Sequence, residues 1–370
     1  MDTSRVRNRL RRLREEHNWS QVELANQLAF KDRQTISAIE NGERKISADE
    51  LVKIADLFGV ELEFFFDPFR LYGEADFSWR QKNVLESHLN KFEEKAGQFI
   101  GLYRWLLAEK NDHTNVLHQS LYLNENSLFE DATLAGEELA YRFTQASLPP
   151  AQSLQKYVEE QLGMLVLYVD AISGISGAAC RLPQLGTILV NRRENEGRRH
   201  FDIAHELFHL LTWDTMEPRR IDSEHPSGIK DKRIENLADS FASGILMPLI
   251  ALQPFIEKRD DMDIHTWLNT TASALHVSAQ ALKFRVKGMN VFKRAELDAV
   301  SDAKLKNNGA TKPAMDNVPP LFSHKFLSLL AWGLDDGRLS VRRAASLLGI
   351  SIDQLATTFS EHDIACPFEL

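Results

Sequence analysis

The chain has 370 residues, 43% of them hydrophobic, so it can form two or three domains with cores of their own. Its two cysteines, Cys180 and Cys366, exclude a disulfide framework, and the arginine-rich N-terminus lacks the apolar segment of a signal peptide, so we expect a cytoplasmic protein with no membrane partner. The net charge of −9 argues against a nucleic-acid partner, but residues 1–45 hold ten basic against seven acidic side chains.

Residues 4–66 predict short helices separated by tight turns. Ser20 followed three residues later by Glu23 is a capping box, and Asp32 is a cap for the next helix. The stretch "SADELVKIADLFGV" predicts a further amphipathic helix that ends at a glycine. The N-terminal sixty residues therefore predict a small helical bundle.

The stretch "WSQVELANQLAFKDRQTISAIENGERKIS" resembles the helix-turn-helix of XRE-type (lambda-repressor-like) regulators. The resemblance implies a DNA-binding domain over residues 1–66, with a double-stranded DNA operator as partner and the third helix in the major groove. The base-facing candidates are Arg33, Gln34 and Ser37, and the candidates for phosphate or groove-edge contacts are Gln21, Arg44 and Lys45. The turn before the third helix is one residue longer than usual. The alternative is a helical module for protein contacts, because residues 1–66 are about neutral overall.

Residues 67–130 predict a linker followed by a long helix. Pro68 and Gly73 mark an exposed linker over 67–78, and the stretch 79–110 predicts one continuous helix. After the Pro149-Pro150 break, short strands are expected at 164–169, 177–181 and 186–191. The pattern then changes back to a helix.

The stretch "RRHFDIAHELFHLLTW", residues 198–213, sets His205 and His209 four apart with Glu206 between them. At about 100° per residue, an apolar stripe forms on one face of this helix and the two histidines lie at its edge. Two imidazoles at this spacing can hold one zinc ion, and the glutamate can take the proton of a water that attacks a carbonyl. The alternative is a half-buried helix whose histidines only form hydrogen bonds.

A second stretch, "RIENLADSFASGILMP", supplies a candidate third ligand. Glu235 and Asp239 are four apart on one face, and the small residues Ala238 and Ala242 predict close packing against another helix. The alternative for Glu235 is a surface ion pair with Arg233 nearby.

Together the two stretches resemble the ImmA/IrrE family of zinc-dependent peptidases. The resemblance implies a zincin-like α+β domain with a small sheet over residues 131–257 and zinc as the cofactor. By it, His205, His209 and Glu235 are the metal ligands and Glu206 is the catalytic base, while Asp239 accepts the free N–H of a ligand histidine. Phe208 departs from the family, in which many members have glycine there. His225, in a loop, is a candidate for a transition-state donor.

The rest of the chain is predicted to be a helical extension and linker over 258–320 and a helical element over 321–370. The stretch "GRLSVRRAASLLGISIDQLATTF" has the pattern of a helix-turn-helix but few basic residues. It predicts an interaction or dimerisation element, so a homodimer is a candidate assembly. The whole chain is therefore expected to be α+β, and mainly α.

Three functions are compatible with these patterns. The first is a DNA-binding regulator whose zinc endopeptidase domain cleaves a protein substrate, a transcriptional repressor, to derepress stress, phage or mobile-element genes. The second is a transcription factor whose peptidase-like domain only senses a ligand or a metal. The third is a protein that cleaves itself in the 67–78 linker. A sensor does not need a carboxylate at Glu206, so this residue favours the enzyme.

Overall fold

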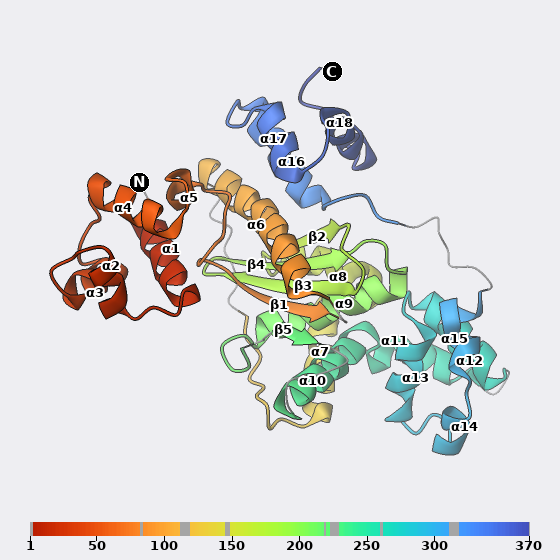
Figure 1. The fold of residues 1–370 in the computed structure, drawn as a ribbon. Coiled ribbons are helices and arrows are strands. Elements are labelled where there is room, and N and C mark those ends of the chain that lie inside the picture. The colour runs from red at the N-terminus through yellow and green to blue at the C-terminus, as the bar shows by residue number, and fades with distance from the viewer. Residues whose placement is uncertain are drawn as a thin grey trace.

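The fold is mainly helical with one central sheet, as the sequence predicts (Figure 1). The computed structural model describes residues 3–81, 84–111, 119–144, 149–217, 220–222, 229–259, 262–310 and 318–369. In Figure 1 the N-terminal helices form a separate group beside the sheet. The C-terminal helices lie on the side of a long helix, α6, that faces away from this group. No single helix in these residues is long and apolar enough to cross a membrane; one bent pair, Asp231–Leu246 with Leu249–Ile256, meets the criterion by length and composition only when joined.

The N-terminal group is a five-helix bundle whose turns follow the predicted capping signals. Ser20 and Glu23 form the predicted capping box, and the Asp32 carboxylate accepts the Thr35 N–H at 3.1 Å to start the third helix. Leu10 and Ile36 are fully buried in the bundle core. The helices are α1 (Thr3–Glu16), α2 (Gln21–Gln27), α3 (Arg33–Asn41), α4 (Ala48–Phe58) and α5 (Glu63–Phe66).

The segment after this bundle differs from the prediction. Residues 76–81 form a strand, β1 (Asp76–Gln81), and helix α6 (Glu86–Glu109) begins only afterwards, so the prediction of one helix over 79–110 is wrong at its start. Trp79 is the physical reason: its side chain is 1% exposed, and its indole N–H donates to Glu93 on α6 at 2.8 Å. An alternating pair of aromatic residues, Phe77 and Trp79, fits a strand that is covered on one face.

The prediction of an exposed 67–78 linker is also wrong. Phe69 and Leu71 are buried, and the buried guanidinium of Arg9 in α1 donates to the Asp67 carbonyl at 2.8 Å. Glu74 then pairs with Arg9 at 3.1 Å and with Arg104 of α6 at 2.9 Å. The segment therefore fixes the N-terminal bundle to α6, and a protease would have to unfold it before it could cut there.

The sheet contains five strands in the order β2-β4-β3-β1-β5. Strands β2 (Leu165–Val169), β3 (Ile175–Leu182) and β4 (Leu185–Asn191) confirm the three predicted strands. Strands β3 and β4 form an antiparallel hairpin, and β2 runs parallel to β4. The sequence did not predict β1, which pairs antiparallel with β3, or β5 (Arg220–Asp222), which runs parallel to β1. The sheet thus includes a strand from the segment before residue 131.

Two hydrophobic cores cover opposite faces of the sheet. One core includes Val166 and Ile188 and holds the helices of the middle region. The other includes Leu167 and Leu189 and packs against α6 and the C-terminal helices. The middle helices are α7 (Phe129–Tyr141), α8 (Pro150–Glu160), α9 (Glu196–Leu211), α10 (Ile229–Leu246) and α11 (Leu249–Ile256).

The stretch 258–320 is more ordered than its polar composition suggested. It contains α12 (Ile264–Ala274), α13 (Ala279–Lys287), α14 (Arg294–Asp298) and α15 (Asp302–Leu305). The predicted linker at 304–320 lies partly outside the described residues, which omit 311–317. The helices of the extension pack against the core that includes Trp267 and Leu268.

The C-terminal helices α16 (His324–Asp335), α17 (Val341–Leu348) and α18 (Ile352–Glu361) bury their apolar faces within the chain. Leu330 of α16 and Leu348 of α17 are almost completely buried in the core that α6 shares. This element therefore interacts with the chain's own long helix, and its predicted role in dimerisation stays a prediction.

Candidate metal site and nucleic-acid interface

Helix α9 carries the central part of the candidate metal site. Asn195 caps it by accepting the Arg198 N–H at 2.9 Å, and the apolar stripe at Ala204, Phe208 and Leu211 is buried against the sheet and neighbouring helices. The ring of Phe208 lies 5.6 Å from that of Phe241 on α10. This large residue therefore fills the contact between the two helices that carry the site.

Helix α10 is positioned by an unusually close contact with α7. A Cβ on Gly136 of α7 would lie 2.4 Å from the Phe241 carbonyl oxygen, and one on Gly244 would lie 2.2 Å from that of Thr133. Only glycine permits this approach. Ala238 and Ala242 are also fully buried, which confirms the close packing predicted for α10.

The two helices bring the predicted ligand residues together. The Nε2 atoms of His205 and His209 lie 3.2 Å apart, and each is 3.3 Å from one carboxylate oxygen of Glu235. One ligand atom from each residue lies within 4.8 Å of the others, and the histidine side chains are 1% and 2% exposed. Two imidazoles and one carboxylate are a donor set that suits zinc and leaves an open position.

Charge distribution supports the same assignment. Burial raises the pKa of Glu235, but the imidazoles of His205 and His209 outweigh burial and hold the pKa of that carboxyl well below its usual range. Asp239 lies 2.9 Å from Nδ1 of His205, so this histidine presents Nε2 to the centre of the cluster.

Arg233 donates to the carbonyls of Glu125 and Ser127 at 2.6 and 2.7 Å, and these contacts argue against the ion pair considered for Glu235.

Glu206 lies beside the cluster and is buried. Its side chain is 1% exposed, and neither carboxylate oxygen has a hydrogen-bond partner among the described residues. Burial raises its pKa above the usual value, although His205 and His209 oppose the shift. An ideal Cβ on Gly177 of β3 would lie 3.4 Å from Glu206 Oε1, so the absence of a side chain there leaves room beside the carboxylate. A buried carboxylate without a partner is costly unless something binds next to it. The residues therefore fit a resident metal ion with a reacting water.

The structure adds polar residues that the sequence analysis did not single out. Asp202 is fully buried one turn before His205, and Arg198, one turn earlier, lies 3.2 Å from its carboxylate. Arg198 also reaches Ser176 Oγ on β3 at 3.5 Å. The spacing of Arg198, Asp202 and His205 on one helical face was the signal available in the sequence. His225, the candidate for a transition-state donor, lies outside the described residues.

The predicted DNA-contacting residues lie on α2, α3 and the turn after α3. Arg33, Gln34 and Lys45 are exposed, and Ser37 is half-buried. Gln21 donates to Glu40 at 2.9 Å, and Arg44 pairs with Glu50 at 2.6 Å. Arg33, Gln34 and Lys45 are therefore exposed to a ligand in solvent, whereas Gln21 and Arg44 interact with neighbouring side chains.

Glu40 is a structural residue of this bundle that sequence reasoning missed. Its side chain is 1% exposed and accepts Arg14 Nε of α1 at 2.7 Å as well as the Gln21 amide of α2. One buried carboxylate of α3 therefore connects three helices and fixes the direction of α3. In Figure 1, α2 and α3 are at the end of the bundle away from the sheet, which leaves α3 accessible.

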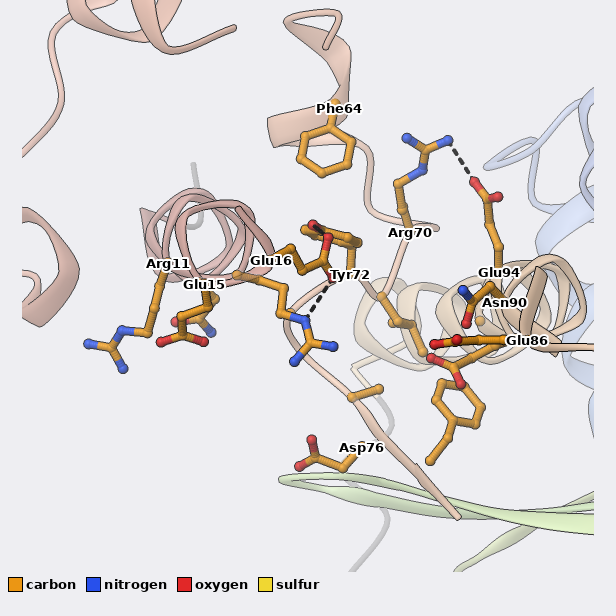
Figure 2. Close-up of a pocket in the computed structure, with 18 of the residues that line it drawn as sticks. Arg11, Glu15, Glu16, Phe64, Arg70, Tyr72, Asp76, Glu86, Asn90 and Glu94 are labelled. Atoms are coloured by element: carbon orange, nitrogen blue, oxygen red, sulfur yellow. Dashed lines mark hydrogen bonds and ion pairs between the residues drawn. The ribbon is translucent and has the colours of Figure 1, made fainter. Parts of the chain in front are cut away.

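A cleft lies between the bundle and α6. It has a volume of about 980 Å³ and is lined by residues of α1, the 70–77 segment and α6 (Figure 2). Arg70 crosses it to pair with Glu94 at 2.9 Å, as Figure 2 shows. The bundle is therefore joined to α6 by polar contacts around a water-accessible space.

Comparisons with known families find one match over the N-terminal bundle and one over the region that contains α9 and α10. A family model described as helix-turn-helix matches residues 10–65, and the M78 peptidase model, described as IrrE N-terminal-like domain, matches residues 159–287. No curated protein and no solved structure matches the chain. The second match contains α9, α10 and the three candidate ligands. The chain therefore combines an N-terminal helix-turn-helix DNA-binding domain with an IrrE N-terminal-like domain of the M78 metallopeptidases.

Proposed function

We propose that this protein is a DNA-binding regulator with a zinc-dependent endopeptidase domain that cleaves a transcriptional repressor. The observation that carries the proposal is the convergence of His205, His209 and Glu235 beside the buried carboxylate of Glu206. A sensor of metal or ligand needs the first three residues only. A hydrolase also needs a base, and the buried carboxylate of Glu206 beside the cluster supports that role.

The roles of the residues follow from their positions. His205, His209 and Glu235 would hold zinc, which when bound supplies a Lewis acid that polarises the scissile carbonyl and lowers the pKa of water. Glu206 would accept the proton of the attacking water and pass it to the leaving amine. Asp239 orients His205 through Nδ1. The burial of Glu206 away from solvent strengthens its electrostatic interactions in the reaction.

The remaining parts of the proposal concern location and partners. Residues 10–65 match a helix-turn-helix, so we place the protein in the cytoplasm on a double-stranded operator, with Arg33, Gln34 and Ser37 toward the bases. The packing of the 67–78 segment favours cleavage of another chain over cleavage of its own. Loss of a repressor would then release stress, phage or mobile-element genes.

The test compares wild type with Glu206→Gln on candidate repressors encoded in the same genome, with zinc added. The amide keeps the size of the side chain but cannot accept the proton, so cleavage should fall by ~10²- to 10⁴-fold. Bound zinc and DNA binding should be unchanged, and Glu160→Gln, an exposed carboxylate on α8, should cleave like wild type. If Glu206→Gln derepresses the target genes as well as wild type does, proteolysis is not the mechanism, and the domain acts as a sensor.

A further inference from the structure

A second cavity lies on the face of the sheet opposite the metal site. It has a volume of about 480 Å³ and is enclosed by α6, the ends of β2 and β4, and the α17–α18 region. Strands β2 and β4 run parallel, and their carboxyl ends at Val169 and Asn191 open toward it. In α/β sheets, ligands bind in crevices at the carboxyl ends of parallel strands. The size also falls within the ~300–1,000 Å³ typical of small-molecule sites.

The walls of this cavity combine apolar and polar side chains that come from segments far apart in the sequence. The aromatic rings of Phe99 on α6 and Phe322 before α16 meet edge to face at 5.1 Å. The Phe322 N–H donates to the Tyr168 carbonyl of β2 at 2.7 Å, which holds this wall against the sheet. The apolar part of the lining consists of Phe92, Phe99, Val169, Leu321, Phe322, Leu348 and Ile350. A ligand with an apolar body would therefore be desolvated there.

The rim of the cavity is cationic. Asp170 accepts Nε of Arg192 at 2.9 Å and Nε of Arg193 at 2.8 Å, so its carboxylate is already occupied. Arg192 also donates to the Pro319 carbonyl at 3.1 Å, whereas the side chain of Arg193 remains 67% exposed. Arg193 therefore keeps N–H groups that face solvent at the rim.

Lys95 is the second available cation. Its ammonium lies 5.8 Å from the centre of the Phe99 ring, and a Cβ on Gly349 would be 3.5 Å from Nζ, so the side chain reaches from α6 toward the turn between α17 and α18. Within the described residues, no acidic side chain lies within ion-pair distance of it. Glu361 is the one other acidic group of the lining. Lys95 and Arg193 against Glu361 leave a surplus of one positive charge, which matches a monoanion.

We propose that this cavity binds a small monocarboxylate with an apolar aliphatic or aromatic body. The carboxylate lies between Lys95 and Arg193, and the body fills the space beside Phe99 and Phe322. Arg193 is two residues before Asn195, the cap of α9, and Arg199 of α9 donates to the Arg192 carbonyl at 3.4 Å. A ligand held by Arg193 therefore contacts the segment that leads into the helix of the metal site, and its binding does not depend on the proposed proteolysis.

The test is calorimetric titration of the full chain with two carboxylates, indole-3-acetate and octanoate, each beside its amine counterpart, tryptamine and octylamine. At least one carboxylate should bind at one site per chain, and its amine counterpart should bind at least tenfold more weakly. Lys95→Gln should weaken the binding of that carboxylate by about tenfold or more, because the substitution removes a charge-assisted hydrogen bond. Lys91→Gln, one turn earlier on the exposed side of α6 and outside the cavity, should bind like wild type.

A blocking variant tests the location. Thr357 is exposed on α18 and lines the cavity, so Thr357→Trp should fill the space and abolish binding while the circular dichroism spectrum stays that of wild type. The proposal is overturned if neither carboxylate binds, if the amines bind equally well, or if Lys95→Gln or a folded Thr357→Trp protein retains wild-type affinity.

Discussion

The helix-turn-helix bundle and the α9–α10 cluster both depend on polar side chains, but in opposite environments. Arg33 and Gln34 are exposed, whereas His205, Glu206 and His209 are almost completely buried. An exposed polar group that is removed loses only its own contact with a ligand. A buried one also leaves its neighbours without partners in a medium that solvates them poorly. Substitutions should therefore have graded effects in the bundle and nearly complete effects in the cluster.

The two regions also differ in how they are held. In the cluster, Asp239 lies 2.9 Å from Nδ1 of His205, and packing of α7 against α10 and of Phe208 on α9 against Phe241 on α10 holds the helices together. In the bundle, a single buried carboxylate, Glu40, connects three helices and so positions exposed residues that do not touch it. Glu40 is thus a buried polar group of the bundle, comparable to the buried residues of the cluster. It allows the comparison to be tested within one domain.

The largest effect is expected at a metal ligand. His209→Ala removes one of three protein donors, so bound zinc should fall from about one per chain to almost none. Elemental analysis of the purified protein measures this directly. His200→Ala is the matched control on the same helix, because His200 lies 2.8 Å from the His276 carbonyl and outside the cluster. Stoichiometric zinc in the His209→Ala protein would show that the ligand set is wrong.

A smaller effect is expected at Asp239, which touches His205 instead of the metal. Asp239→Asn keeps the shape but weakens the acceptor for the His205 N–H, so zinc affinity should fall by ~10- to 100-fold while stoichiometry at saturation is retained. Competition with a chelator measures the affinity. Asp353→Asn, exposed on α18, serves as control. Unchanged affinity in Asp239→Asn would mean that the geometry of His205 is set by packing alone.

The candidate metal cluster could be predicted from the sequence because each of its parts is local. His205 and His209 lie one helical turn apart, as do Glu235 and Asp239, and a regular helix places such pairs together wherever it packs. The capping boxes of the bundle are local for the same reason. What the sequence could not predict is how α10 is positioned, because its close approach to α7 depends on Gly136 and Gly244, which are far apart in the chain.

The segment 67–85 shows where local reasoning failed. Its strand β1 is stabilised by β3, about a hundred residues later in the chain, and by Glu93 on α6. Trp79 and the residues after it also suit a helix, and the alternation of Phe77 and Trp79 is too short a signal to decide for the strand. The role of Glu40 was missed because its partners, Arg14 and Gln21, are not at helical spacing from it. Both errors concern interactions between distant parts of the chain.

Glu40→Gln tests whether the buried carboxylate that connects α1, α2 and α3 stabilises the bundle. The amide cannot pair ionically with Arg14, whose side chain is itself 12% exposed, so the bundle should lose about 1–3 kcal/mol of stability. Hydrogen exchange of the full chain should show faster exchange in α1–α3 and unchanged exchange in α9. Glu43→Gln, exposed on the same turn, should change stability by less than about 0.5 kcal/mol. Equal protection in the Glu40→Gln protein would show that apolar packing alone fixes α3.

The smallest effects are expected at exposed residues of the DNA-binding surface. Duplexes selected from a random pool by the full chain provide the reference sequence. If Gln34 contacts a base edge, Gln34→Ala should lose about 1–3 kcal/mol on that sequence and discriminate less at one position. Lys45→Ala should weaken all duplexes about equally and reduce the salt dependence by about one ion, because a phosphate contact carries no sequence information. If both variants bind every duplex like wild type, these side chains do not meet DNA, and the exposed face of the bundle is better explained as a protein-contact surface.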